Sequence, residues 1–540
     1  MNANTAGDRR ILSFLNWSLR EESQYISAWG WNRRCPHSQA PGMSKPLPRS
    51  SGGCWTCRIR HRKCDESLPE CKECTDRHIK CHGYGPEPEW AKDPASLREE
   101  LQRIKHAVKQ NFRQTRKLQA ARSPQRASTS SLTGLDDPSS SSSSKDSEFR
   151  EAELLMHYLD YIFPIQYAYY VDKPATGGRG WLFWLLSKQG PLRQAAFTLS
   201  ALHQHSTSES KTEEMESELI RYHTNAMQEL RQVLIHGETD GFASHPEQRV
   251  EFLTCGTFLI SFEIFQGGTS KWEPHLNALV SVASQIRPND DGSLSFQSPK
   301  LEPGLQRMVD AAMRFHMAQL LWFEMVACVA TGKAPKLPYQ TWLALDDLDM
   351  SCVMGCQNWA MLALGDVALL ETQLAEMSSS LARRRSYDLR QRLRAGIDGL
   401  RNTNDEASAP MICQAVTRVY ATATLSQLRA FTAIDFEYHE EVHEAVAEVI
   451  SALEEMPKGA SLRGLTWPMC VAGAIARQDQ QDFFERILTA NLETSGTSFT
   501  NFGTVLLILR ESWEHRDDFR NDRNATRSAM RRLGISALLV

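Results

Sequence analysis

The sequence predicts two unlike parts: a small cysteine-rich module near the N-terminus and a large all-α domain of antiparallel helices. Three observations support this fold class. Six of the 13 cysteines fall between residues 54 and 81. From residue 149 onward, apolar residues recur at helical spacing, and no region shows sustained alternation with hairpin turns. Between these parts lies an unbroken run of serines from Ser139 to Ser144, which is typical of a disordered linker.

The charges are divided unevenly along the chain. The whole sequence has 61 Lys and Arg against 65 Asp and Glu, a net charge of -4. Residues 1–53 carry a net +4, residues 54–126 a net +7 and residues 127–540 a net -15. Because residues 1–126 are basic and residues 127–540 are acidic, the N-terminal part is the one favoured to contact nucleic acid. A composition with 41% hydrophobic and 23% charged residues excludes a fully disordered or collagen-like chain.

The clustered cysteines repeat one spacing twice. The pattern C-x2-C-x6-C has its six positions at Cys54, Cys57, Cys64, Cys71, Cys74 and Cys81. Thiolates are the ligands that zinc prefers, and C-x2-C lets one turn offer two sulfurs to one ion. A disulfide knot is the alternative, but such knots are typical of small secreted chains, and neither a secretory leader nor a membrane span is evident. Six cysteines satisfy two tetrahedral zinc ions only if two of them bridge.

This run resembles the DNA-binding module of the fungal Zn2Cys6 binuclear zinc cluster transcription factors. All six cysteine positions agree with the family pattern, and so does Pro69, two residues before the fourth cysteine. The resemblance implies two Zn2+ ions per chain, bridged by Cys54 and Cys71. The remaining ligands would be Cys57 and Cys64 for one ion and Cys74 and Cys81 for the other.

Basic residues crowd the loop between the second and third cysteines of the module. They are Arg58, Arg60, His61, Arg62 and Lys63. The resemblance implies that a short helix beginning near Cys57 enters the major groove, and that Arg60 and His61 occupy the positions that read a CGG triplet. Arginine can donate two hydrogen bonds to guanine. The family more often has lysine in place of His61, so base contact and phosphate contact stay as alternatives there. The other three side chains are assigned to phosphate.

The boundaries of the module follow from composition. Residues 54–90 form the zinc module and end in a connector rich in glycine and proline. Residues 91–120 are expected to form a basic helix, because Leu97, Leu101, Ile104 and Val108 are spaced four, three and four apart. Two alternatives stay open for that helix: a coil that makes a homodimer, and a solitary helix lying on phosphates.

The composition predicts two further segments that cannot bury a hydrophobic core. Residues 121–148 are expected to be a disordered, serine-rich linker. Residues 1–53 are expected to be disordered as well. Because Met43 lies close before the first clustered cysteine, one interpretation is that residues 1–42 are a gene-model extension.

Residues 149–540 are expected to form the helical domain. A stripe from Met215 to Val233 predicts a helix that ends at Gly237, and a second helix should run from about Leu305 to Ala330. Blocks at residues 157–164, 190–203, 331–339, 349–359 and 467–473 resemble the fungal-specific transcription factor regulatory domain of the second type. That resemblance implies a regulatory role and, in some members, binding of a small effector.

Two acidic motifs suggest an enzyme but lack the required partners. His439, Glu440 and His443 fit H-E-x-x-H, yet no third ligand follows, so both histidines are interpreted as surface residues. The acidic cluster that ends at Asp349 has Met350 where a D-D-x-x-D site needs its last acid, which favours use as a helix N-cap or in a turn. The isolated cysteines are expected to be buried, and they are Cys255, Cys328, Cys352, Cys356, Cys413 and Cys470.

The sequence therefore predicts a nuclear, zinc-dependent, sequence-specific transcription factor without enzymatic activity. Its expected partners are double-stranded DNA at RNA polymerase II promoters and the transcription machinery, with no membrane association. Metabolic, secondary-metabolite or drug-response genes are the candidate targets. An α-helical enzyme, or an effector-binding sensor, that carries a DNA-targeting zinc module is the alternative.

Overall fold

The computed structural model divides the chain into a small unit within residues 30–138 and a larger unit that contains residues 139–540. Of the small unit it describes residues 53–60, 64–75, 79–86, 88, 91, 93, 96, 100, 103 and 104. Of the larger unit it describes residues 142–540 except 173–177, 241–244, 270–271, 287–301, 346, 402–410, 434–439, 496–498 and 520–523. The predicted N-terminal segment, and the linker as far as residue 141, lie outside these residues.

The described part of the larger unit is helical and contains no strand. Its first elements are α6 Ser142–His157, the π-helical turn η1 Tyr158–Ile162, α7 Phe163–Gln166, α8 Gly180–Leu186, α9 Pro191–Thr207, α10 Glu213–Asp240, α11 Pro246–Phe265, α12 Trp272–Ala283 and α13 Pro303–Thr331. The next are α14 Tyr339–Leu343, α15 Ser351–Met354, α16 Asn358–Gln373, α17 Ser379–Arg401, α18 Met411–Thr432 and α19 Glu440–Glu454. The last are η4 Arg463–Leu465, α20 Thr466–Ala474, α21 Gln478–Ser495, α22 Phe502–Glu514, η5 Arg516–Phe519 and α23 Ala525–Leu533.

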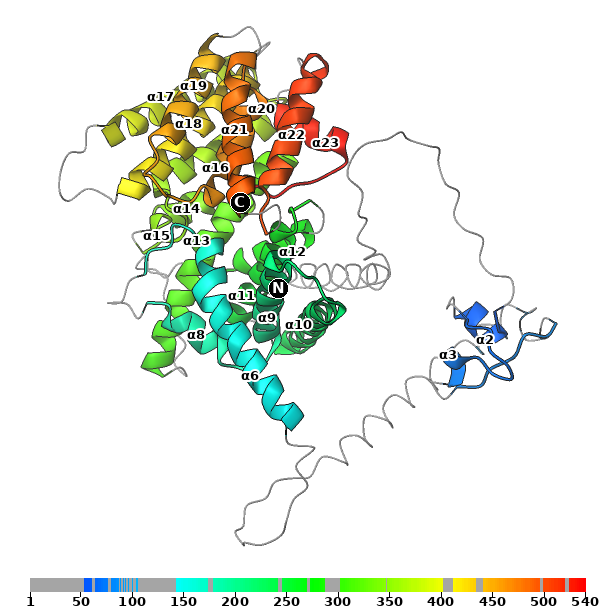
Figure 1. The fold of residues 1–540 in the computed structure, drawn as a ribbon. Helices are drawn as coiled ribbons and strands as arrows, with labels where there is room; N and C mark the ends of the chain where they lie inside the picture. The colour runs from blue at the N-terminus through cyan, green and yellow to red at the C-terminus, as the bar shows by residue number, and fades with distance from the viewer. Residues whose placement is uncertain are drawn as a thin grey trace. The chain divides into compact units, whose positions relative to one another are not determined.

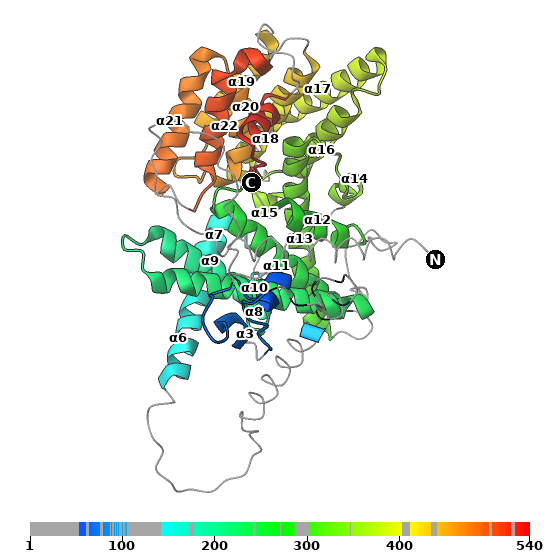
Figure 2. The same ribbon diagram turned by 90° about the vertical axis from the view of Figure 1, so that its right-hand side faces the viewer.

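The helices of the larger unit form two groups, which Figures 1 and 2 show from two directions. Helices α6 and α8–α11 lie in one group, and α16–α22 lie in the other. Consecutive helices pack on each other, as α9 does on α10, α11 on α12 and α18 on α19. This pairing agrees with the predicted fold class.

Helix α13 connects the two groups. It packs against α8, α11 and α12 on one side and against α16 and α23 on the other. Every residue from Phe315 to Ala330 is buried, because a helix that is apolar on all sides must be surrounded by other helices. The helix ends at Gly332, whose left-handed φ of 71° suits glycine. The predicted long helix is thus confirmed. No described helix has both the length and the apolar character that a membrane crossing needs.

The buried polar side chains around His316 are paired with one another. His316 on α13 contacts Thr254 Oγ1 through Nε2 at 2.7 Å and Gln319 Oε1 through Nδ1 at 3.0 Å. The Gln319 amide nitrogen in turn donates to the hydroxyl of Tyr167. Buried polar groups are costly unless they are hydrogen-bonded. In this series of hydrogen bonds, every side chain has at least one partner.

The segment after α23 closes the first group from a distant part of the sequence. Leu538 N donates to the carbonyl of Gly268, and Ser536 N donates to the carbonyl of Thr269. Trp272 Nε1 donates to the Ser536 carbonyl at 2.8 Å. Because Trp272 and Leu538 are both fully buried, the core of the first group includes residues from the segment after α23, at the C-terminal end of the sequence.

Two sequence-based boundaries differ from the structure. Helix α10 continues through Gly237 to Asp240, because one glycine costs a helix only about 1 kcal/mol and does not by itself end it. Helix α6 begins at Ser142, so the expected boundary at residue 149 falls inside a helix, and the last residues assigned to the linker are helical. Serine is an acceptable helix residue, which composition alone does not reveal.

Candidate metal centre and nucleic-acid interface

The small unit is built from two similar half-modules. Each half has a short helix that begins directly after a cysteine: α2 Trp55–Ile59 follows Cys54, and α3 Lys72–Thr75 follows Cys71. Cys54 caps α2, because its sulfur accepts from the backbone N–H of Cys57 at 3.4 Å. The local helix of each C-x2-C pair therefore turns two sulfurs toward the same point.

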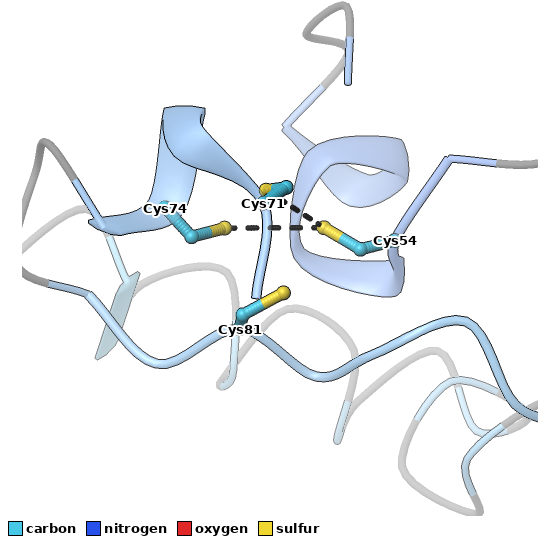
Figure 3. A group of neighbouring side chains, drawn as sticks. All are labelled: Cys54, Cys71, Cys74 and Cys81. Carbon is cyan, nitrogen blue, oxygen red and sulfur yellow. Dashed lines mark hydrogen bonds between the residues drawn. The ribbon is translucent and has the colours of Figure 1, made fainter. Parts of the chain in front are cut away.

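The six thiols converge into two groups of four that share two members. Within each group the sulfur atoms all lie within 4.8 Å of one another. The first group is Cys54, Cys57, Cys64 and Cys71, and the second is Cys54, Cys71, Cys74 and Cys81. Figure 3 shows the second group, with the sulfurs of three of its members joined by dashed lines. Cys54 and Cys71, the positions that the sequence resemblance makes bridging, are the two shared members.

The distances between the sulfurs fit tetrahedral zinc. Zinc–sulfur bonds of about 2.3 Å at tetrahedral angles place two sulfurs about 3.8 Å apart. The Sγ atoms of Cys54 and Cys71 are 3.6 Å apart, those of Cys54 and Cys74 3.9 Å, and those of Cys57 and Cys71 3.7 Å. All described cysteines are free thiols, so no disulfide competes for these sulfurs.

The buried thiols have strongly shifted acidities. Burial raises the pKa of Cys54 to about 12 and also raises the pKa values of Cys57 and Cys74. At Cys64, burial acts in the same direction, but hydrogen bonds from the N–H groups of Cys54 and Glu66 outweigh it and lower the pKa to about 7. A metal ion must therefore displace protons from most of these thiols when it binds.

Arg60, the residue expected to read a base, directly follows α2 and is held within the module. The Arg60 guanidinium lies 3.5 Å from a carboxylate oxygen of Glu73 in α3, and only 10% of the Arg60 side chain is exposed. Arg60 Nη1 is buried without a hydrogen-bond partner. Arg58 lies over the ring of Trp55, with its guanidinium carbon 4.7 Å from the ring centroid. The other predicted contact residues, His61, Arg62 and Lys63, lie outside the described residues.

Helix α2 is tied to the chain that follows the cysteines. Thr56 Oγ1 donates to the carbonyl of Lys80 and contacts His82 Nδ1, both at 2.9 Å. His82 N donates back to Thr56 Oγ1 at 2.9 Å. Trp55 Nε1 donates to the Gly85 carbonyl at 2.8 Å. The sequence analysis did not identify these anchors, because each joins residues more than 23 positions apart without a metal-like spacing to reveal it.

Part of the predicted basic helix packs onto the zinc module. Ile104 is 5% exposed and belongs to one apolar cluster with Ile79 and the buried cysteines. Glu100 Oε1 lies 3.5 Å from His82 Nε2. Ile104 is one of the residues predicted to form a dimer seam, and here its side chain is used within the chain. The other seam residues, Leu97, Leu101 and Val108, lie outside the described residues.

The H-E-x-x-H motif of the larger unit differs from expectation. His443 is 3% exposed rather than on the surface, and its carbonyl accepts from Gln480 Nε2 at 3.0 Å. The reason is its position three residues before the buried Val446, on the same face of α19. His443 belongs to none of the metal-like groups among the described residues. His439 lies outside them.

The other chemical motifs of the larger unit have structural roles. Asp349 Oδ1 accepts from the backbone N–H and the hydroxyl of Ser351, so Asp349 stabilises the turn before α15, although the N-cap residue of that helix is Met350. Five of the six isolated cysteines are buried as predicted. Cys352 is half-buried instead, and its thiol donates to Asp349 Oδ2 at 2.8 Å.

Comparison with known proteins covers both units. Residues 52–91 match the Fungal Zn(2)-Cys(6) binuclear cluster domain, and residues 153–540 match the Fungal specific transcription factor domain. The Pestheic acid cluster transcriptional regulator 3 of Pestalotiopsis fici is 27% identical over 88% of this chain and 96% of its own length. The Trichothecene biosynthesis transcription regulator TRI10 of Trichoderma arundinaceum is 28% identical over 69% of this chain and 93% of its own length.

A shorter match has a higher identity. Transcription factor phomR of Diaporthe leptostromiformis is 46% identical over 63 residues, which are 12% of this chain and 10% of that protein. No solved structure matches the chain.

Two groups of four thiols with shared members, on a basic module attached to a large helical domain, define a zinc-cluster regulator of transcription. The chain belongs to the fungal Zn(2)-Cys(6) transcription factors that carry the fungal-specific transcription factor domain.

Proposed function

We propose that the chain acts in the nucleus on RNA polymerase II promoters and reads CGG triplets through α2 and the basic residues after it. In this proposal Cys54 and Cys71 bridge two zinc ions, each completed by the two other thiols of its group. Arg60 supplies the base contact, and Arg58 supplies a phosphate contact. The helical domain contacts the transcription machinery and receives a small effector, and residues 91–120 supply a coil that makes a homodimer.

The observation that carries this proposal is the pair of thiol groups sharing Cys54 and Cys71. The two bridging sulfurs fix α2 and α3 to the same pair of ions, so the orientation of α2 depends on the metal. Structural zinc supplies the folding energy of modules this small. A helix held in that way can present Arg58 and Arg60 to a groove without a large core beneath it.

The target genes are proposed from the relatives. The printed names of two of them refer to a pestheic acid cluster and to trichothecene biosynthesis, both of which are pathways of secondary metabolism. We accordingly expect this chain to regulate a cluster of secondary-metabolite genes. No observation on the helical domain favours an enzyme, since the H-E-x-x-H histidine His443 is buried in helix packing.

The test measures zinc and DNA binding on the full chain. Elemental analysis should give two zinc ions per chain, and the zinc-loaded protein should prefer duplexes that contain CGG triplets. Cys71→Ser should abolish both properties, because that sulfur serves both ions. Cys81→Ser should cause a smaller loss, because its sulfur serves one ion only.

Cys470→Ser is the matched control, because Cys470 is a buried thiol of the larger unit outside either group. It should keep two zinc ions and the CGG preference. One zinc ion per chain would contradict the binuclear assignment. Equal affinity for CGG-containing and scrambled duplexes would contradict the proposed readout even if both ions are present.

A further inference from the structure

Helix α17 is strongly basic, although the part of the chain that contains it is acidic. The segment Ser379–Arg401 has seven arginines against two aspartates, whereas residues 127–540 together carry a net charge of -15. The helix lies at the edge of its group in both views of the fold (Figures 1 and 2). It packs against α16 and α18 and buries Leu389 and Leu393, so the opposite side of the helix faces solvent.

In the C-terminal half of α17, ion pairs with neighbouring helices account for Arg392 and Arg394. Arg394 donates to both carboxylate oxygens of Glu448 in α19, at 2.5 and 2.6 Å. Arg392 donates to a carboxylate oxygen of Asp366 in α16 at 2.8 Å. These charges therefore help to join α17 to the rest of its group.

In the N-terminal half, three consecutive arginines have no such partners. Arg383, Arg384 and Arg385 are all exposed, and none of them forms an ion pair with a carboxylate of the described residues. Arg383 Nε donates to the backbone carbonyl of Ser379 at 3.3 Å, and Arg385 Nη1 donates to the side-chain carbonyl of Gln373 at 2.9 Å. Both acceptors are neutral. We call these three residues the α17 arginine cluster.

The α17 arginine cluster does not stabilise the helix that carries it. Adjacent like charges repel each other, and cations toward the N-terminal end of a helix oppose its dipole. The first turn of α17 has no acidic residue. Asp388 follows the cluster and offsets at most one of its three charges. The fold therefore gives no reason for this concentration of charge, whereas an anionic partner does.

The side chains around the cluster suit phosphate oxygens. Tyr387, which is 57% exposed, lies one turn after Arg383 and Arg384, and the hydroxyl-bearing residues Ser379 and Ser380 are exposed just before them. Arginine, serine and tyrosine side chains all donate to phosphates in protein–DNA interfaces. An acidic peptide would also need buried apolar anchors. This surface offers mainly donors, so the phosphate backbone fits it better.

We propose that the α17 arginine cluster contacts the phosphates of duplex DNA that flanks the triplet bound by the zinc module. The inference rests on the proposed DNA binding and adds a second contact, on the helical domain. Thirty-seven residues separate Ile104 from Ser142, and a chain of this length spans at most about 130 Å. The flanking DNA is therefore within reach, and the first contact raises its local concentration. Phosphate contacts add affinity without adding base specificity.

The test uses the full zinc-loaded chain and two duplexes with the same triplet, a short one that ends just beyond it and a long one with flanks on both sides. Affinity is measured over a range of salt concentrations. One variant combines Arg383→Gln, Arg384→Gln and Arg385→Gln. On the long duplex this variant should reduce the slope of log K against log salt by about two to three, because each phosphate contact contributes about 0.9. Its slope on the short duplex and its base preference should match those of the parent.

The matched control combines Arg307→Gln, Lys458→Gln and Arg486→Gln, which remove the same charge from exposed positions on other parts of the larger unit. The control should keep the parent's slope on both duplexes. Equal reductions by the two variants would show a general effect of net charge and overturn the contact. An unchanged slope in the cluster variant overturns it too, and a loss of reporter output with DNA binding intact would assign the cluster to an acidic protein instead. Failure of the proposed DNA readout is distinguishable, because it would appear on the short duplex with the parent chain.

Discussion

At the scale of single residues, the contact between Arg60 and Glu73 matters most for DNA binding. An arginine that reads guanine must extend both nitrogens of its fork toward the base. Here the fork is turned toward α3, it is mostly covered, and one of its nitrogens is unpaired. If Arg60 reads a base as proposed, it must exchange Glu73 for guanine, so that Glu73 competes with DNA for this guanidinium.

We expect Arg60→Ala and Glu73→Gln to have opposite effects on binding to a CGG site. Arg60→Ala should cost about 1–3 kcal/mol at the cognate triplet and relax the preference for guanine. Glu73→Gln should strengthen binding by up to about fivefold, because a partly exposed ion pair contributes roughly 0.2–1 kcal/mol. Competition with duplexes that carry each base at each triplet position measures both effects.

Glu70→Gln is the control for the change in net charge. Glu70 is exposed in the same half-module, and its contact with a neighbouring side chain is made through its backbone carbonyl. Its substitution removes the same charge without touching Arg60. If Glu70→Gln and Glu73→Gln strengthen binding equally, the effect is long-range repulsion of phosphate, and the specific competition is wrong.

At the scale of elements, the chain that follows the cysteines forms a clasp over the zinc module. We define the clasp by Glu100, which lies 3.5 Å from His82, and Ile104, which belongs to the apolar cluster that contains Ile79 and the buried cysteines. Because His82 is hydrogen-bonded to Thr56 in α2, the contact between Glu100 and His82 also helps to hold α2 in place. A side chain in the expected dimer seam thereby acts within one chain.

Ile104→Ala should weaken binding to a single CGG triplet. Loss of a buried isoleucine costs about 2–5 kcal/mol of packing, and the loosened clasp should let α2 move. Faster amide hydrogen exchange at Thr56 and His82 would report that loosening directly. The parent chain and the variant are compared on one duplex with a single triplet.

The paired substitutions Leu101→Lys and Val108→Lys test the coil separately. If those positions form a dimer seam, single-triplet binding should stay and the gain from a paired site should disappear. If Ile104→Ala instead leaves single-triplet binding unchanged and removes only the gain from the paired site, then Ile104 serves the dimer and the clasp has no role in positioning α2.

Features that are set by residues close together in the sequence could be predicted, whereas features that depend on contacts between distant residues could not. The thiol groups follow from spacings of two and six residues, and the end of α13 follows from Gly332 together with Pro335 and Pro338 beyond it, so both could be predicted. The partner of Arg60 was not predicted, because it lies in the other half-module and no pattern links the two residues. The burial of His443 was missed for a different reason: its place three residues before Val446, on the buried face of α19, was a local signal that the interpretation of the motif set aside.

At the scale of the whole molecule, buried histidines make the helical domain sensitive to acid. Burial lowers the pKa of His316 to about 4, against an ordinary value of 6.5. Its neighbours Thr254, Gln319 and Trp181 carry no charge that could offset this. Between pH 6.5 and 4, the unfolded chain binds a proton at His316 that the folded chain does not. Stability from this residue is therefore constant above pH 6.5 and falls as the pH drops toward 4.

We expect the urea midpoint of the full chain to decrease from pH 7 to pH 5, and His316→Gln to reduce that decrease. The variant should be less stable at pH 7, because it loses the fit of the ring to Thr254. The difference in pH slope between the two proteins isolates His316 from the carboxyl groups that titrate in the same range. Identical slopes would show that His316 is protonated when folded or contributes nothing to the acid sensitivity.

The contact between Gly268 and Leu538 also constrains how the protein is made. A ribosome adds roughly 5–20 residues per second, so about 15–50 s separate the synthesis of these two residues. Throughout that interval the buried face of Trp272 lacks the segment that covers it in the finished protein. The first helix group therefore leaves the ribosome with an incomplete core. We expect its uncovered apolar surface to need protection from aggregation while translation continues, and a chain that ends before residue 536 to leave that surface exposed.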